Sequence, residues 1–167
     1  TGLIDGGHLW VDGSVDLFYL RGYRRGLECA IEGAEYARRY AVAYAVRRAD
    51  TSRETNNALR VLARVYEATG NPRFGDAADA IARAYLCCFD ADGSEVSLEE
   101  SLTRLRKEFA GSCWEQMPEI LEYNWSGHSG YQYIGYLAPA IQYWAAIGRT
   151  PAGIELARRF DQFAGSI

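Results

Sequence analysis

The feature of this sequence that most constrains its fold is a turn phrase that occurs three times. Each copy has an aromatic or apolar helix end, a glycine-centred turn and the start of a second amphipathic segment. The three turns centre on Gly22, Gly70 and Gly148. Glycine suits the left-handed residue after a helix, and the Asn-Pro and Thr-Pro pairs after the second and third glycines suit the cap and first residue of the next helix. The phrase predicts three consecutive helical hairpins.

The intervals between the turn glycines are unequal, at 70 − 22 = 48 and 148 − 70 = 78 residues. Repeat architectures accommodate insertions on one face, so the longer interval predicts an insertion before the third hairpin. We therefore expect a single domain over residues 1–167. Its hairpins are predicted over about 8–41, 52–89 and 129–164, with the insertion over about 90–126.

Apolar residues recur at helical spacing within these ranges, and alternating strand patterns are almost absent. Two capping-box patterns, Thr51 to Glu54 and Ser97 to Glu100, predict where two of the helices begin. The fold class that follows is all-α, with consecutive antiparallel helical hairpins.

Composition excludes several classes of partner. The chain is 49% hydrophobic and 24% charged, which is typical of a globular protein. With a net charge of −4 it has no basic field, so we expect no nucleic-acid partner. The longest charge-free stretch, residues 123–148, includes Pro139 and several polar residues, and its apolar part is shorter than the roughly 18 residues of a membrane span. We expect a buried helix there and no membrane association.

The four cysteines, Cys29, Cys87, Cys88 and Cys113, have no metal-ligand spacing. We interpret them as small, buried apolar residues, with disulfide pairing as the alternative. The acidic loop that begins at Asp90 is too short for an EF-hand. The sequence therefore predicts neither a metal nor a cofactor.

Hairpins that stack in the same sense place the starts of their first helices at one rim. Both histidines, two tryptophans and several polar residues fall there: His8, Trp10, Asp12, Arg53, Asn56, Asn57, Trp125, His128 and Tyr131. Aromatic rings can stack on the apolar faces of sugars while polar groups bind their hydroxyls. Each residue taken alone also fits a structural role at a helix end or in the core. Their clustering favours a glycan site.

Residues 7–13 (GHLWVDG) and 16–22 (DLFYLRG) resemble a phrase of (α/α)-toroid carbohydrate-active proteins, nearest the exo-rhamnogalacturonan lyase-like family. Residues 53–74 resemble the next hairpin of those proteins. The resemblance covers nearly the whole chain, although six-hairpin glycosidases and glycuronyl hydrolases share its motifs. It implies part of an (α/α) toroid that acts on a polysaccharide or oligosaccharide, and a secreted or periplasmic parent if that parent degrades polysaccharide, with a cytoplasmic one still open.

The chain departs from this pattern in three ways that bear on function. It has Asp12 where the phrase often has Glu, Ser14 where an apolar residue is usual, and Arg21 before the turn glycine where Thr is usual. It also supplies about three hairpins, whereas the resemblance implies a ring of six. Two explanations stay open: the chain is part of a longer enzyme, or it pairs with a second copy as a homodimer.

Three functions compete for this chain. A polysaccharide lyase needs a base, a group that binds the uronate carboxylate and an acid for the leaving oxygen. We assign these roles to His8 or His128, to Arg53 with Asn57, and to Tyr131 or Tyr19, and expect Trp10, Asp16, Tyr19, Asn56 and Trp125 to bind substrate. A glycoside hydrolase would use Asp12 and Asp16 as paired carboxylates. A non-catalytic module would bind a glycan or a partner chain without turnover.

Overall fold

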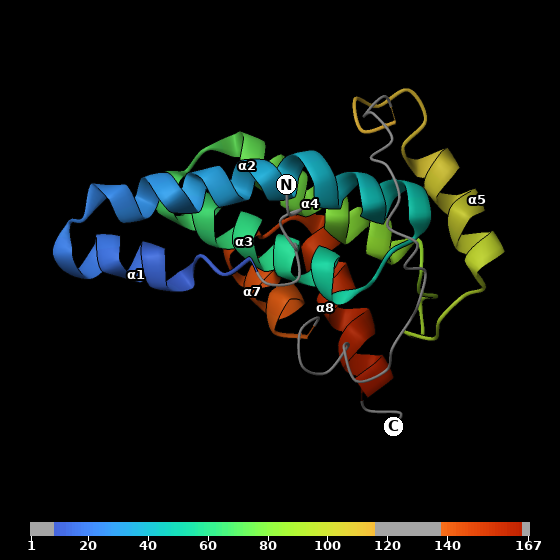
Figure 1. Cartoon of the computed structure of the whole chain (residues 1–167). Coiled ribbons are helices and arrows are strands. Elements are labelled where there is room, and N and C mark those ends of the chain that lie inside the picture. The colour runs from blue at the N-terminus through green and yellow to red at the C-terminus, as the bar shows by residue number, and fades with distance from the viewer. Residues whose placement is uncertain (1–8, 116–137, 165–167) are drawn as a thin grey trace.

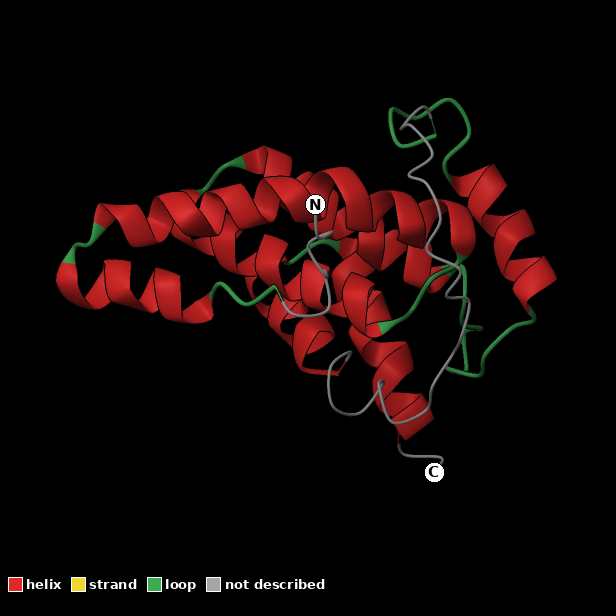
Figure 2. Ribbon diagram, viewed as in Figure 1, coloured by secondary structure: helices red, strands yellow, loops and turns green. Residues whose placement is uncertain are grey.

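The computed structural model describes residues 9–115 and 138–164, and every helix or strand element in these ranges is a helix (Figure 2). The prediction of an all-α fold is therefore confirmed. The helices are α1 (Asp12–Arg21), α2 (Arg24–Arg48), α3 (Arg53–Thr69), α4 (Pro72–Leu86), α5 (Leu98–Glu108), α7 (Ala138–Gly148) and α8 (Pro151–Ala164).

Three of the hairpins, α1–α2, α3–α4 and α7–α8, stack into two layers (Figure 1). One layer contains α1, α3 and α7, in which α3 packs against both neighbours. The other contains α2, α4 and α8, in which α4 packs against both neighbours. The core between the layers is rich in alanine, because α2 turns Ala30, Ala34, Ala37 and Ala41 inward. Such small side chains let helices lie close together.

The first two turns have the predicted glycine geometry. Gly22 and Gly70 adopt left-handed φ values of 65° and 62°, and each donates its N–H to the carbonyl four residues earlier at 2.8 Å. The third turn differs, because Gly148 belongs to α7 and Arg149 takes the left-handed conformation with φ of 50°. A Cβ at Gly148 would lie 2.6 Å from the Trp144 ring. Glycine is required there by ring packing.

A second pattern joins the two layers within each later hairpin. The Tyr66 ring lies over Gly75, where a Cβ would approach it to 3.0 Å, and Trp144 lies over Gly153, where a Cβ would approach it to 2.8 Å. Both members of the second pair follow the first by 78 residues, since 144 − 66 = 153 − 75 = 78. The two rings also touch edge to face, with centroids 5.7 Å apart. One packing unit thus recurs from hairpin to hairpin.

The first predicted capping box is wrong. The N-cap of α3 is Ser52, whose N–H and Oγ–H both donate to the Asp50 carboxylate at 3.0 and 2.8 Å. The N-cap is therefore one residue later than the sequence predicted. The second box is confirmed in its main bond, because Ser97 Oγ accepts from the Glu100 N–H at 3.2 Å and α5 ends at the expected place before Gly111.

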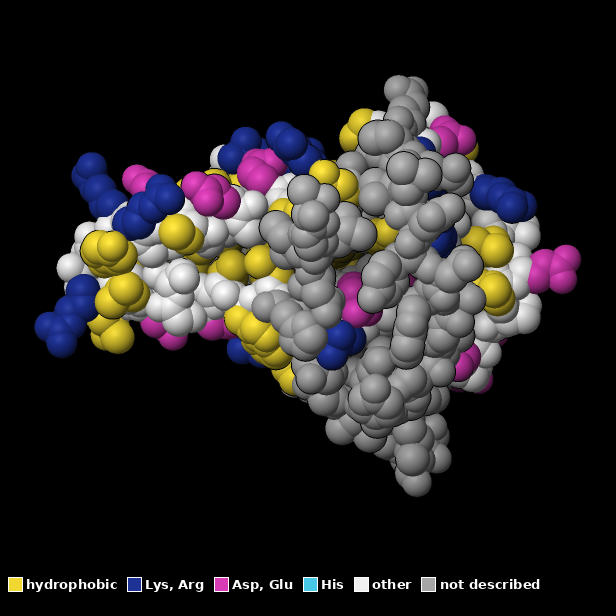
Figure 3. All heavy atoms as spheres, in the orientation of Figure 1, with side chains coloured by type: hydrophobic (Ala, Val, Ile, Leu, Met, Phe, Trp, Pro, Cys, Tyr) yellow, Lys and Arg dark blue, Asp and Glu magenta, His cyan; other side chains and the backbone are white. Residues whose placement is uncertain are grey.

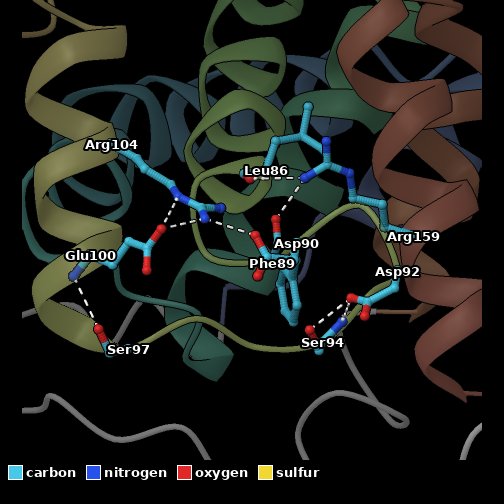
Figure 4. A network of polar contacts seen from close by, with 9 residues as sticks. All are labelled: Leu86, Phe89, Asp90, Asp92, Ser94, Ser97, Glu100, Arg104 and Arg159. Carbon is cyan, nitrogen blue, oxygen red and sulfur yellow. Dashed lines mark hydrogen bonds and ion pairs between the residues drawn. The ribbon is translucent and has the colours of Figure 1, made fainter.

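Arginines of α5 and α8 hold the segment that follows α4 (Figure 4). Arg104 of α5 forms ion pairs with Glu100 at 2.5 Å and with Asp90 at 2.7 Å. Arg159 of α8 donates to the carbonyls of Leu86 and Phe89 at 3.3 and 2.6 Å. It therefore satisfies acceptors at the C-terminal end of α4, where a positive charge is favourable.

The expected burial of the cysteines needs correction. Cys87 and Cys88 are buried, and burial raises their pKa values to about 11 and 12, but Cys29 and Cys113 are exposed. None of the described helices is both long enough and apolar enough to cross a membrane.

We expect Gly153→Ala to lower the free energy of unfolding by about 1–3 kcal/mol, because the added methyl group overpacks the Trp144 ring. Gly13→Ala is the matched control, since a Cβ at this helical glycine meets nothing within 4 Å. It should raise the free energy of unfolding by about 0.5–1 kcal/mol. Urea denaturation measures both, and equal effects of the two variants would contradict the packing argument.

Candidate functional site

A polar stripe runs along one side of α3, and of its members only Asn57 is buried. Its members recur at alternating steps of four and three residues: Arg53, Asn57, Arg60, Arg64 and Glu67. This spacing keeps them on one side of the helix. Arg53 and Asn57 were predicted from the sequence, and the other three were not.

Helix α1 faces this stripe with two carboxylates one turn apart. Asp12 lies 3.3 Å from the Arg60 guanidinium, and Asp16 pairs with Arg64. Each pair spans 48 residues, since 60 − 12 = 64 − 16 = 48, which is the interval between the first two turn glycines. Equivalent positions of successive hairpins therefore lie side by side, and α1 and α3 run parallel.

Each of these arginines also contacts an aromatic ring. The Arg60 Cζ lies 5.7 Å from the Trp10 ring centroid, and the Arg64 Cζ lies 5.6 Å from that of Tyr19. Both contacts fall within cation–π distance. The two rings are each 52% exposed, so much of their surface stays open to solvent. We call these six residues the arginine–aromatic wall: Trp10, Asp12, Asp16, Tyr19, Arg60 and Arg64.

Arg64 extends the wall to α7. It lies 2.5 Å from Glu67 and 3.3 Å from the Tyr143 hydroxyl, which in turn donates to Glu67 at 2.5 Å. Burial raises the pKa of Tyr143 to about 12, and the neighbouring Glu67 acts in the same direction. Burial lowers the pKa of Arg64, but its bonds to Tyr143, Asp16 and Glu67 outweigh burial and raise it overall. Arg64 stays charged and links three helices.

The start of α3 contains a separate, buried polar cluster. The Tyr85 hydroxyl lies within hydrogen-bond distance, 2.7 Å, of both Thr55 Oγ1 and Asn56 Oδ1, and Asn56 donates to the Thr51 carbonyl at 3.2 Å. Asn56 is fully buried, and Asn57 is 3% exposed. The Asn56 side chain therefore holds α3 to α4 and faces no solvent.

The structure brings four predicted residues together in the wall: Trp10, Asp12, Asp16 and Tyr19. Arg53 and Asn57 lie on the same face of α3, seven and three residues before Arg60. Four further predictions, His8, Trp125, His128 and Tyr131, lie outside the described residues. The 48-residue interval could have identified Arg60 and Arg64 as the partners of Asp12 and Asp16.

The wall can bind a polar ligand that has apolar faces. Its rings offer stacking surfaces, its guanidiniums offer donors, and its carboxylates offer acceptors. Within residues 9–115 and 138–164, no three His, Cys, Asp or Glu side chains are grouped so that they could hold a metal ion. The chemistry that the described residues support is recognition by stacking and hydrogen bonding.

Comparison of this chain with protein-family models, with curated proteins and with solved structures finds no match. The wall must therefore be interpreted from its own geometry.

We expect the free energy of unfolding to fall as pH rises from 10 towards 12, because the raised pKa of Tyr143 means that the unfolded chain loses this proton first. Below pH 10 the contribution of the protonated Tyr143 to the free energy of unfolding is fully present. Tyr143→Phe should reduce the slope in this window, and Tyr23→Phe, at the exposed α1–α2 turn, should keep it. Urea unfolding at several pH values measures the slopes, and an unchanged slope in Tyr143→Phe would contradict the assignment.

Proposed function

We propose that this chain is a carbohydrate-active domain that binds an acidic polysaccharide along the arginine–aromatic wall and cleaves it by β-elimination. The observation that carries the proposal is the pairing of two half-exposed rings with two arginines at successive turns of α3. Arg60 and Arg64 are four residues apart, which is roughly 6 Å along a helix. The wall therefore offers two similar binding units in a row, as suits a ligand made of repeating units.

The charges of the wall favour an acidic glycan. Arg60 is 41% exposed at its side chain and has one carboxylate partner, Asp12, whereas Arg64 is enclosed by three partners. Arg60 is thus the wall cation best placed to meet a uronate carboxylate. Arg53, further along the same stripe, is 31% exposed and forms a second candidate.

Elimination from a uronide removes the proton beside the carboxylate, forms a carbon–carbon double bond and breaks the bond to the leaving oxygen, which takes up a proton. Binding of the carboxylate by an arginine stabilises the negative charge that develops on it. Tyr19, beside Arg64 and half exposed, is our candidate for the proton donor. His8 or His128 remains our candidate for the base, and Tyr131 the alternative donor.

A glycoside hydrolase is the second candidate, with Asp12 and Asp16 as its carboxylates. The two roles in hydrolysis require different surroundings for the acid and for its partner. Here both aspartates face a guanidinium in much the same way. This similarity favours elimination over hydrolysis. The third candidate, a module that binds without turnover, requires only the stacking surfaces.

The two-layer stack also supports, as part of the same proposal, a place for this chain in an (α/α) toroid. In such a ring the layer of α1, α3 and α7 would line the interior, and the wall would face the bound glycan. The parallel course of α1 and α3 is consistent with that arrangement.

We expect Trp10→Ala and Tyr19→Ala each to weaken binding of a pectic or other uronate-containing oligosaccharide about three- to tenfold, since a stacking contact is worth roughly 0.5–1.5 kcal/mol. Tyr23→Ala is the matched control, because Tyr23 has the same 52% exposure but lies at the hairpin turn outside the wall. Titration calorimetry measures the affinities. Equal losses in all three variants would contradict binding at the wall.

Ultraviolet absorbance of the unsaturated uronide distinguishes the three functions. An increase in absorbance that is lost in Arg60→Ala supports elimination. New reducing ends without absorbance would indicate hydrolysis, and binding with neither product would indicate a non-catalytic module.

A further inference from the structure

One lateral edge of the hairpin stack is apolar and uncovered. On α1, Leu17 is 42% exposed and Leu20 is 80% exposed, and a Cβ at Gly13 would meet nothing within 4 Å. Figure 3 shows hydrophobic side chains gathered at the end of the α1–α2 hairpin, which extends beyond the other helices. The side of α1 opposite α3 thus has no neighbour in the described chain.

The repeat identifies what this edge is built to contact. Positions 48 residues later on α3 are Val61, Val65 and Ala68. Val61 and Val65 are 3% and 0% exposed, and Ala68 packs against the core. On α3 these positions lie on the side of the helix away from Tyr66, whose ring faces α7. They therefore face the preceding hairpin, whereas no described helix lies on the equivalent side of α1.

The outer layer, which contains α2, α4 and α8, has an ion pair that indicates what could contact the uncovered edge of the first hairpin. Arg73 of α4 pairs with Glu35 of the preceding outer helix α2 at 2.7 Å. The residue 48 positions before Arg73 is Arg25 of α2, whose side chain is 59% exposed and pairs within the helix with Glu28 at 3.0 Å. Adding both repeat intervals to the position of Glu35 gives 35 + 48 + 78 = 161. Residue 161 is Asp161, which is exposed on α8 at the opposite end of the stack. The two ends carry complementary charges at matching positions.

We infer that a second copy of this chain stacks on the α1–α2 edge through its own α7–α8 hairpin. Leu17 and Leu20 are covered at the contact, and Arg25 of one copy pairs with Asp161 of the other. The contact repeats the arrangement of the internal Arg73–Glu35 pair. It goes beyond glycan binding, because it depends on no residue of the arginine–aromatic wall.

The solution mass of the purified chain tests the inference, by light scattering over a range of concentrations. We expect wild type to have the mass of two or more copies. Leu17→Asp combined with Leu20→Asp should give the mass of one copy, and its helical circular dichroism should match wild type because both positions are exposed. Leu98→Asp is the matched control, since Leu98 is 44% exposed on α5 away from this edge.

Charge reversal supplies a sharper test. Arg25→Asp alone and Asp161→Arg alone should each shift the chain towards the mass of one copy, because like charges then meet at the contact. An equimolar mixture of the two variants should recover the larger mass, since each reversed charge meets its complement on the other variant. A single-copy mass for wild type, or a larger mass insensitive to these substitutions, would overturn the inference.

Discussion

The register between neighbouring hairpins is the constraint on which the rest of the structure depends. A shift of one residue along a helix rotates a side chain by about 100°, so the ion pairs of α1 with α3 form in one register only. Asp12–Arg60 and Asp16–Arg64 mark that register on the first boundary, and the Tyr66–Trp144 contact marks it on the second. This register places the residues of the arginine–aromatic wall beside one another and brings Tyr143 to Arg64.

Hydrophobic periodicity was sufficient to predict the helices, and the turn glycines were sufficient to predict two of the three turns. The burial of Phe74, Ile81 and Tyr85 follows from their spacing on one face of α4, and the structure has them fully buried. The spacing predicts this burial because the side chains that enter the core are mainly those on the apolar face of a helix.

Features that depend on particular side-chain contacts were not predicted. Gly148 has the sequence of a turn residue, but the Trp144 ring needs the space beside it and Arg149 makes the turn. Thr51 and Glu54 match a capping box, but the N-cap is Ser52, whose N–H and hydroxyl donate to the Asp50 carboxylate. Arg60 and Arg64 escaped notice in the same way, since a stripe of charge on a helix is ordinarily a solvated face. Their partners lie in another hairpin.

The wall contributes less to stability than its number of ion pairs suggests. Side chains in the Arg60–Asp12 pair are 41% and 31% exposed, and pairs this open are typically worth about 0–1 kcal/mol. Arg64 is different, because its side chain is 19% exposed and joins three helices. A substitution at Arg60 therefore tests recognition with little loss of folding, whereas a substitution at Arg64 disturbs both. Arg60 and Trp10 are therefore the part of the wall most available to a ligand.

Stacking of a second copy would also lengthen this wall. The residue of α7 equivalent to Asp16 is Gln142, since 16 + 48 + 78 = 142, and it is exposed. By the register of the internal boundaries, Gln142 of one copy lies beside Asp16 of the next. An amide can donate to a carboxylate already paired with Arg64, so the junction needs no new charge. A glycan that follows the wall of one copy would then meet, at its end, the rings and guanidiniums of another.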